Sequence, residues 1–172
     1  MGNANAKKNV KLLGSGTILL QVQKAAQILH DEFGVASQVY SVTSFNELAR
    51  NGQDVERENM LNPESKQSKP YITEVLEEGF EGPTIAATDY IKNYSDQVRA
   101  FVPGSYRVLG TDGFGRSDSR ANLRRHFEVD AAHIAYASLY ELYKAGSIDA
   151  KALAKAAQSL DIDPAKPNPF YA

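Results

Sequence analysis

Short apolar segments that suit β-strands alternate along this 172-residue chain with longer stretches in which apolar residues recur at helical spacing. The first strand is predicted at Asn9–Leu13, and the helical stretch that follows it reaches Phe33. Three further strands are predicted at Gln38–Val42, Thr84–Thr88 and Tyr106–Leu109. Strands that alternate with helices favour an α/β fold with a mostly parallel sheet between two helical layers, a three-layer αβα arrangement.

Turn and capping residues indicate where the helices begin and end. Gly34 is expected to cap the end of the first helix, and Thr43–Ser44 to cap a second helix that starts near Phe45. The second helix is expected to fade around Asn51–Gly52, with Asp54–Asn59 as a separate helical piece.

The second half of the chain is predicted to be mainly helical. Tyr71–Glu78 is compatible with either a helix or a strand. Asp89 is expected to cap a helix whose apolar face comprises Ile91, Tyr94, Val98 and Phe101. Two or three closing helices are predicted, at Arg120–Phe127, roughly Ala131–Ala145, and Ala150–Leu160, followed by a proline-rich tail, Pro164–Ala172.

The composition excludes several classes of site. The chain has no cysteine, which rules out disulfide frameworks, thiolate zinc sites and cysteine nucleophiles. Its net charge of −2 does not mark it as a nucleic-acid-binding or membrane-surface protein. No apolar stretch approaches the ~20 residues that span a bilayer, and Met1–Val10 is too polar for a secretion signal. A cytoplasmic location is therefore expected, with residues 1–8 as a disordered leader or a cloning scar and residues 9–172 as one domain.

The loops after the strands are the first place to look for a site, because ligands of open α/β sheets bind beyond the carboxyl ends of the strands. Gly14-Ser15-Gly16 resembles a phosphate-binding turn, but Leu19 stands where the dinucleotide pattern needs glycine, and no Gly-Lys-Ser/Thr follows. A tight turn is the favoured interpretation.

Two predicted strands end in the same dipeptide, Thr88-Asp89 and Thr111-Asp112. If the strands are adjacent, the two carboxylates approach each other and suit a metal site or an acid–base pair. The favoured interpretation is that Asp89 caps a helix and Asp112 forms a turn.

Arg116, Arg120 and Arg124 recur every four residues, which predicts a basic stripe on a helix. Such a stripe suits a phosphate, a carboxylate or an acidic partner. The favoured alternative is a face that is solvated or paired within the chain, with Asp118 and Glu128 as the nearby acidic partners.

Several longer stretches resemble a known family. They are Leu12–Thr17 (LLGSGT), Tyr40–Leu48 (YSVTSFNEL), Ala87–Tyr90 (ATDY) and Tyr106–Ser119 (YRVLGTDGFGRSDS). These stretches resemble the C-terminal domain of the pyruvate-decarboxylating first component of the pyruvate dehydrogenase complex, of the homodimeric bacterial type. Phe114-Gly115-Arg116-Ser117 is similar to the Phe-Gly-x-Ser element of the transketolase C-terminal domain.

The resemblance implies a sheet of four to five strands. It also implies that the chain is part of a cytoplasmic oxidoreductase, associated with glycolysis, that works in a multienzyme complex. In that family, two preceding domains hold thiamine diphosphate and Mg²⁺, and the cofactor signature is missing here, with Thr111-Asp112-Gly113 as its nearest approach. No catalytic, cofactor-binding or metal-binding residue is therefore assigned. The candidate interface residues are Asp89, Asp112, Phe114, Arg116, Ser117, Asp118, Arg120 and Arg124.

The leading hypothesis is a catalytically silent assembly domain at a dimer interface. Its partners would be the rest of the parent chain, the second subunit and, through the whole complex, the dihydrolipoyl acetyltransferase core, with no nucleic acid and no membrane. One alternative is a stand-alone module that binds a small molecule or anion with the loops of Asp89 and Asp112. Another is a docking module for the acetyltransferase core.

Overall fold

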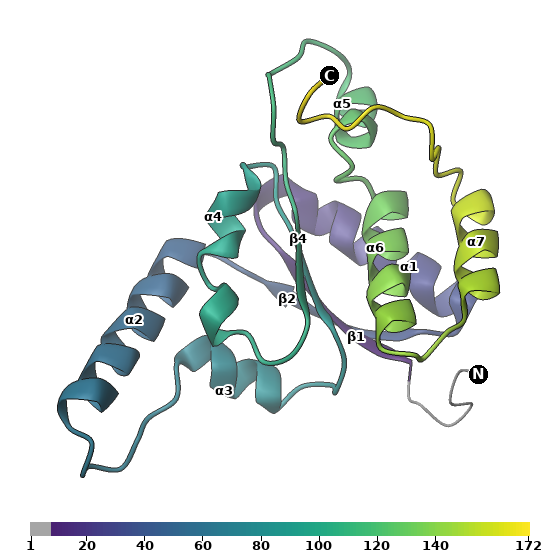
Figure 1. The fold of residues 1–172 in the computed structure, drawn as a ribbon. Helices are drawn as coiled ribbons and strands as arrows, with labels where there is room; N and C mark the ends of the chain where they lie inside the picture. The colour runs from purple at the N-terminus through teal and green to yellow at the C-terminus, as the bar shows by residue number, and fades with distance from the viewer. Residues whose placement is uncertain (1–7) are drawn as a thin grey trace.

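The computed structural model describes residues 8–172, which form a four-stranded, fully parallel sheet (Figure 1). The strands follow the order β2-β1-β3-β4 across the sheet. Their bounds are Asn9–Gly14 for β1, Ala36–Ser41 for β2, Thr84–Ala87 for β3 and Tyr106–Leu109 for β4. All four strands and the α/β class were predicted from the sequence. The fifth strand that the resemblance implies is not among the described residues.

Helices cover both faces of the sheet, so the predicted three layers are confirmed. One face carries α1 (Leu19–Phe33), α6 (Ala131–Lys144) and α7 (Ala150–Ser159). The other carries α2 (Phe45–Leu61), α3 (Tyr71–Glu77) and α4 (Lys92–Asp96), together with the short 3₁₀ helix η2 (Arg99–Phe101). The 3₁₀ helix η1 (Gly16–Ile18) leads into α1, and α5 (Arg120–His126) precedes α6.

The sheet is buried on both sides because neighbouring residues of a strand point to opposite faces. Leu12 packs into the core under α1 and α6, whereas Leu13 packs into the core under α2 and α3. Ile85 and Ala86 divide in the same way on β3. Each face of the sheet therefore has a hydrophobic core of its own.

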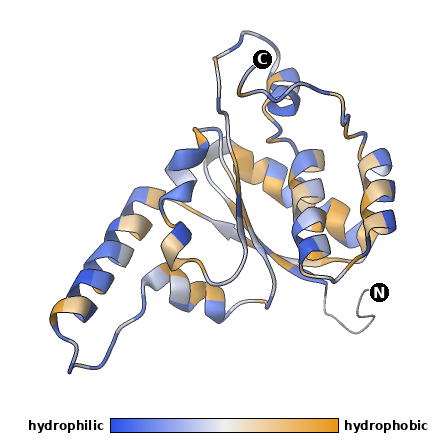
Figure 2. Cartoon of the chain, viewed as in Figure 1, coloured by the Kyte–Doolittle hydropathy of each residue, from blue (hydrophilic) through white to orange (hydrophobic). Residues whose placement is uncertain are grey.

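Helix α2 differs from its prediction. It begins as expected, since the Ser44 hydroxyl accepts a hydrogen bond from the amide of Glu47, but it runs unbroken to Leu61. The expected break at Gly52 is wrong because this buried glycine makes room for Phe101, whose Cδ2 would lie 2.3 Å from an added Cβ. The half of α2 beyond Gly52 projects from the body and is mostly hydrophilic (Figures 1 and 2).

The expected helix after Asp89 was also partly wrong. The structure divides it into α4 and η2, and Asp89 does not cap either of them. The ambiguous stretch from Tyr71 is helical, and the three closing helices are confirmed. The described residues contain no helix that is long and apolar enough to cross a membrane. The interpretation of residues 1–8 as a leader lies, apart from Lys8, outside the described residues.

Candidate functional site

The order of the strands places a topological switch point between β1 and β3. Strand β1 continues into α1 on one face of the sheet, and β3 continues into α4 on the other face. The two loops therefore diverge beyond the carboxyl edge and leave a crevice, which is where open α/β sheets hold ligands.

Hydrogen bonds join these two loops at the base of the crevice. The Ser15 hydroxyl donates to Oγ1 of Thr88 at 2.9 Å, and both side chains are buried. Further out, the Thr17 hydroxyl donates to Oδ2 of Asp89 at 3.3 Å. Gly16 has a φ of 55°, which supports the tight-turn interpretation of this segment.

The two Thr-Asp dipeptides do follow adjacent strands, because Ala87 at the end of β3 pairs with Leu109 at the end of β4. The helix-capping role predicted for Asp89 is wrong, however. The amide of Lys92, at the start of α4, donates to Oδ1 of Asp112 at 2.8 Å, so Asp112 supplies the helix cap. Asp89 bonds instead to Thr17. Sequence reasoning placed the cap on the nearer aspartate, whereas the pairing of β3 with β4 brings the loop after β4 over the start of α4.

The hypothesis of a paired carboxylate site gains no support from this arrangement. Asp112 is engaged by the amide and by the ammonium group of Lys92, the latter at 3.5 Å, and Asp89 is engaged by a hydroxyl. Within residues 8–172, no group of three or more acidic or histidine side chains is arranged to hold a metal ion.

The three arginines line one pocket, although they do not form one helical stripe. Helix α5 begins at Arg120, so Arg116 belongs to the preceding loop. All three border a pocket of about 420 Å³ that also touches Thr17, Asp89 and Thr111; we call it the switch-point pocket. Its apolar lining is formed by Ile18, Leu123, Phe127 and Val129.

Of the two alternatives predicted for these arginines, a solvated face and a face paired within the chain, the pairing with Asp118 or Glu128 is not found in the described part of the chain, whereas Arg116 and Arg120 are exposed. No arginine of the switch-point pocket takes part in an ion pair within residues 8–172. Asp118 instead accepts hydrogen bonds from the amide of Ser119 and the side chain of Asn122, which lower its pKa. Glu128 lies 2.9 Å from the ammonium group of Lys166.

A second hollow of about 440 Å³ shares Arg116 and Leu123 with the switch-point pocket. It is bordered by Ser117, Asp118 and His126. Burial lowers the pKa of His126, and the positive charges of Arg116 and Lys166 lower it further. The Nε2 atom of His126 is buried and has no hydrogen-bond partner among the described residues. Its approach to Arg116 was missed because it depends on the path of the loop.

The loop and the end of the chain lie against each other (Figure 1). Gly113 has a φ of 100°, and an added Cβ would lie 2.4 Å from the carbonyl oxygen of Pro169. Beside this contact, the side chains of Phe114, Phe170 and Tyr171 are 80%, 52% and 83% exposed. Loop 110–119 and the C-terminal tail thus expose three aromatic side chains to solvent next to each other.

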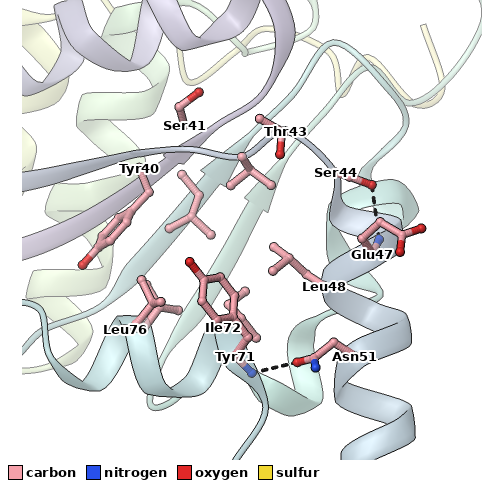
Figure 3. Close-up of a pocket in the computed structure, with 13 residues that line it drawn as sticks. Tyr40, Ser41, Thr43, Ser44, Glu47, Leu48, Asn51, Tyr71, Ile72 and Leu76 are labelled. Carbon is pink, nitrogen blue, oxygen red and sulfur yellow. Dashed lines mark hydrogen bonds between the residues drawn. The ribbon is translucent and has the colours of Figure 1, made fainter.

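A larger, apolar groove of about 600 Å³ lies between the end of β2, the first turns of α2, and α3 (Figure 3). Ile72 and Leu76 on α3 face Tyr40 and Leu48 across it. At its rim the amide of Tyr71 donates to Asn51, and the amide of Glu47 donates to the Ser44 hydroxyl. The sequence did not indicate this groove, because α3 was not resolved as a helix.

Comparisons with known proteins give one consistent family. A sequence model described as "Transketolase-like TK C-terminal domain" matches residues 1–130. The chain is 56% identical over 168 residues to the "Pyruvate dehydrogenase E1 component" of Escherichia coli (strain K12), a match that covers 97% of this chain and 19% of that protein. It is 52% identical over 167 residues to the component of the same name in Haemophilus influenzae, covering 96% and 18%.

A solved structure, "Split gene transketolase, inactive beta4 tetramer", superposes with a TM-score of 0.54 at 16% identity. That match covers 80% of this chain and 40% of the other, and it shows a shared fold. The chain spans about a fifth of the length of the two curated relatives described above.

Proposed function

Because this chain belongs to the transketolase-like TK C-terminal domain family and is homologous to the C-terminal part of pyruvate dehydrogenase E1 components, we propose that it is the assembly domain of such a component. The parent enzyme would be a homodimeric oxidoreductase that decarboxylates pyruvate and reductively acetylates lipoyl groups. This domain would stiffen the subunit interface, and the dihydrolipoyl acetyltransferase core would meet it only through the whole complex.

One surface carries the proposal. We define the contact surface as loop 110–119, Arg120, Arg124 and the tail 164–172. It presents the three exposed aromatic side chains beside three arginines that have no ion-pair partner within residues 8–172. Exposed apolar patches mark interaction sites, and aromatic residues and arginine are enriched at the centres of interfaces. A neighbouring domain or subunit with an acidic, apolar surface would fit this patch.

The loop of the contact surface is also held in place, which favours a recognition role. Its first half is fixed where Asp112 accepts from Lys92 and, one residue later, where Gly113 meets Pro169. A loop that is ordered before binding loses less conformational freedom when it meets a partner.

The residues present do not fit a thiamine diphosphate and magnesium site. Asp112, in the segment nearest to the cofactor signature, is already engaged by the amide and ammonium groups of Lys92. A magnesium ligand needs a carboxylate whose oxygens are free to coordinate the ion. In our proposal the cofactor is held by other parts of the parent protein, and this domain is catalytically silent.

The test uses the full-length parent enzyme with Arg116, Arg120 and Arg124 changed together to alanine. A matched control changes Arg57, Lys151 and Lys155, three exposed cations outside the contact surface, to alanine. Sedimentation velocity measures subunit association, and pyruvate decarboxylation is measured at protein concentrations where the dimer persists. We expect the first variant to associate at least about tenfold more weakly, or about 1.4 kcal/mol, with turnover per dimer preserved.

Two results would contradict the proposal. One is association equal to that of the control variant. The other is an intact dimer that has lost decarboxylation, which would assign these arginines to the chemistry and not to assembly.

A further inference from the structure

The switch-point pocket has the location of a ligand site as well as a suitable lining. It lies beyond the carboxyl ends of β1, β3 and β4, where the loops of β1 and β3 turn to opposite faces of the sheet. Such crevices bind nucleotides and other small molecules in open α/β proteins. Its volume of about 420 Å³ falls within the ~300–1,000 Å³ of pockets that enclose small ligands.

The charge of the lining selects an anion. Arg116 approaches from the loop, while Arg120 and Arg124 lie one turn apart on α5. Guanidinium groups recognise phosphate oxygens through pairs of parallel hydrogen bonds. Asp89 is the acidic side chain of this lining, so three positive charges face one negative charge.

Polar groups on the loops after β1, β3 and β4 favour a ligand that also carries hydroxyl groups. Thr111 donates its hydroxyl hydrogen to the carbonyl oxygen of Asp89 at 2.8 Å, and Thr17 donates to the Asp89 carboxylate. Each hydroxyl oxygen therefore keeps lone pairs for an incoming donor. The remaining lone pairs of the Asp89 carboxylate can likewise accept from a hydroxyl group of a ligand.

We propose that the switch-point pocket binds a small phosphate ester that also carries hydroxyl groups, with its phosphate toward the arginines and a hydroxyl toward Asp89. The proposal does not rest on the assembly role. Because the 172-residue chain has a hydrophobic core on each face of its sheet, ligand binding can be tested on this chain alone. Apolar residues form part of the same lining, so that a ligand held by the arginines would also cover apolar surface.

The experiment is a titration of the ¹⁵N-labelled chain with glucose 6-phosphate, followed by amide chemical shifts at constant ionic strength. Glucose and sodium chloride serve as the uncharged and the non-specific controls. We expect saturable shifts at Thr17, Thr111 and Arg116. Arg120→Gln should weaken binding about tenfold, whereas Arg57→Gln, a change on the projecting part of α2, should leave it unchanged.

A second variant distinguishes recognition of the sugar hydroxyls from recognition of the phosphate. Asp89→Asn should weaken the binding of glucose 6-phosphate relative to that of inorganic phosphate, because only the sugar presents hydroxyl groups to this side chain. A purely structural role of Asp89 beside Thr17 would change both affinities alike.

Three outcomes would overturn the proposal. They are shifts that sodium chloride reproduces, affinities that Arg120→Gln leaves unchanged, and tighter binding of a tetra-aspartate peptide than of the phosphate ester. The last outcome would identify the pocket as a receptor for an acidic protein segment. The first two outcomes leave the assembly role of the contact surface untouched, whereas the third is the result that the assembly role favours.

Discussion

The amide of Lys92 donates a 2.8 Å hydrogen bond to the carboxylate of Asp112, twenty residues further along the chain. This bond caps the helix that follows β3 with a side chain from the loop that follows β4. The base of loop 110–119 is thereby tied to the start of α4. The candidate site thus depends on a contact between two loops whose strands are neighbours in the sheet.

Replacing Asp112 with alanine is expected to reduce the free energy of unfolding by about 1 kcal/mol, the usual cost of a lost helix cap. The loss of the partly exposed Lys92 ion pair should add little. Urea denaturation measures the change. Asp54→Ala, which removes an exposed carboxylate within α2, is the control and should have a much smaller effect. Equal effects of the two substitutions would argue against the cap.

Replacing Gly113 with alanine should release the C-terminal tail from the loop. The new Cβ would lie 2.4 Å from the carbonyl oxygen of Pro169, and a φ of 100° is unfavourable for alanine. We expect faster amide hydrogen exchange across residues 164–172. Gly115→Ala is a matched control, because no atom lies within 4 Å of its added Cβ. Unchanged exchange in the Gly113 variant would refute the contact.

Replacing Gly52 with alanine tests its packing through the sign of the change in the free energy of unfolding. In an exposed helix the change would stabilise the chain by about 0.5–1 kcal/mol, because alanine favours helices more than glycine does. Here the added Cβ would lie 2.3 Å from the ring of Phe101, so we expect a net destabilisation of about 1–3 kcal/mol. Thermal or urea unfolding decides between the two directions, with Gln53→Ala on the exposed face as the control.

Glu141 is expected to make the stability of the fold depend on pH in the acid range. Its carboxylate is buried, with 2% of the side chain exposed, and lies 2.6 Å from Arg107 and 3.2 Å from Lys144. Burial alone would raise the pKa of Glu141, but hydrogen bonds from Ser105, Arg107 and Lys144 outweigh it and the pKa is lowered. A carboxyl whose pKa is lowered by folding stabilises the protein above its unfolded pKa, and this contribution disappears as the pH falls through the folded value.

The free energy of unfolding should therefore fall as the pH drops below about 4.5, the ordinary value for this group. Glu141→Gln is expected to cost about 1–2 kcal/mol at pH 7, because it removes the buried partner of Arg107, whose side chain is 36% exposed and so keeps part of its hydration. It should also flatten the acid limb of the stability curve. Guanidinium unfolding between pH 2 and pH 7 measures both effects, and parallel curves for the two proteins would exclude Glu141 as the cause.

The sequence predicted the strands well because their signal is local. A buried strand such as β3 is a short apolar run, and its boundaries do not depend on distant residues. The start of α2 at Ser44 was predicted for the same reason, since a capping side chain bonds to an amide three residues away. The break expected at Gly52 was wrong because the packing of Phe101 decides it, and that residue lies far along the chain.

The sequence predicted several residues of the candidate site, but not the hydrogen bonds and contacts between them. Asp89, Asp112 and the three arginines were identified from loop position and spacing, and four of these five residues line the switch-point pocket. That Asp112 and not Asp89 accepts from the start of α4 depends on the adjacency of β3 and β4. The contact of Gly113 with Pro169 joins segments that no local pattern relates.

The most direct test of the assembly role compares hydrogen–deuterium exchange in the full-length parent enzyme and in the isolated 172-residue chain. If the contact surface meets a neighbouring domain or subunit, amides in loop 110–119 and the tail 164–172 will exchange at least about tenfold more slowly in the parent. The amides of the projecting half of α2 provide the internal control and should exchange alike in both. Equal exchange of the loop and tail in the two proteins would contradict the assembly role.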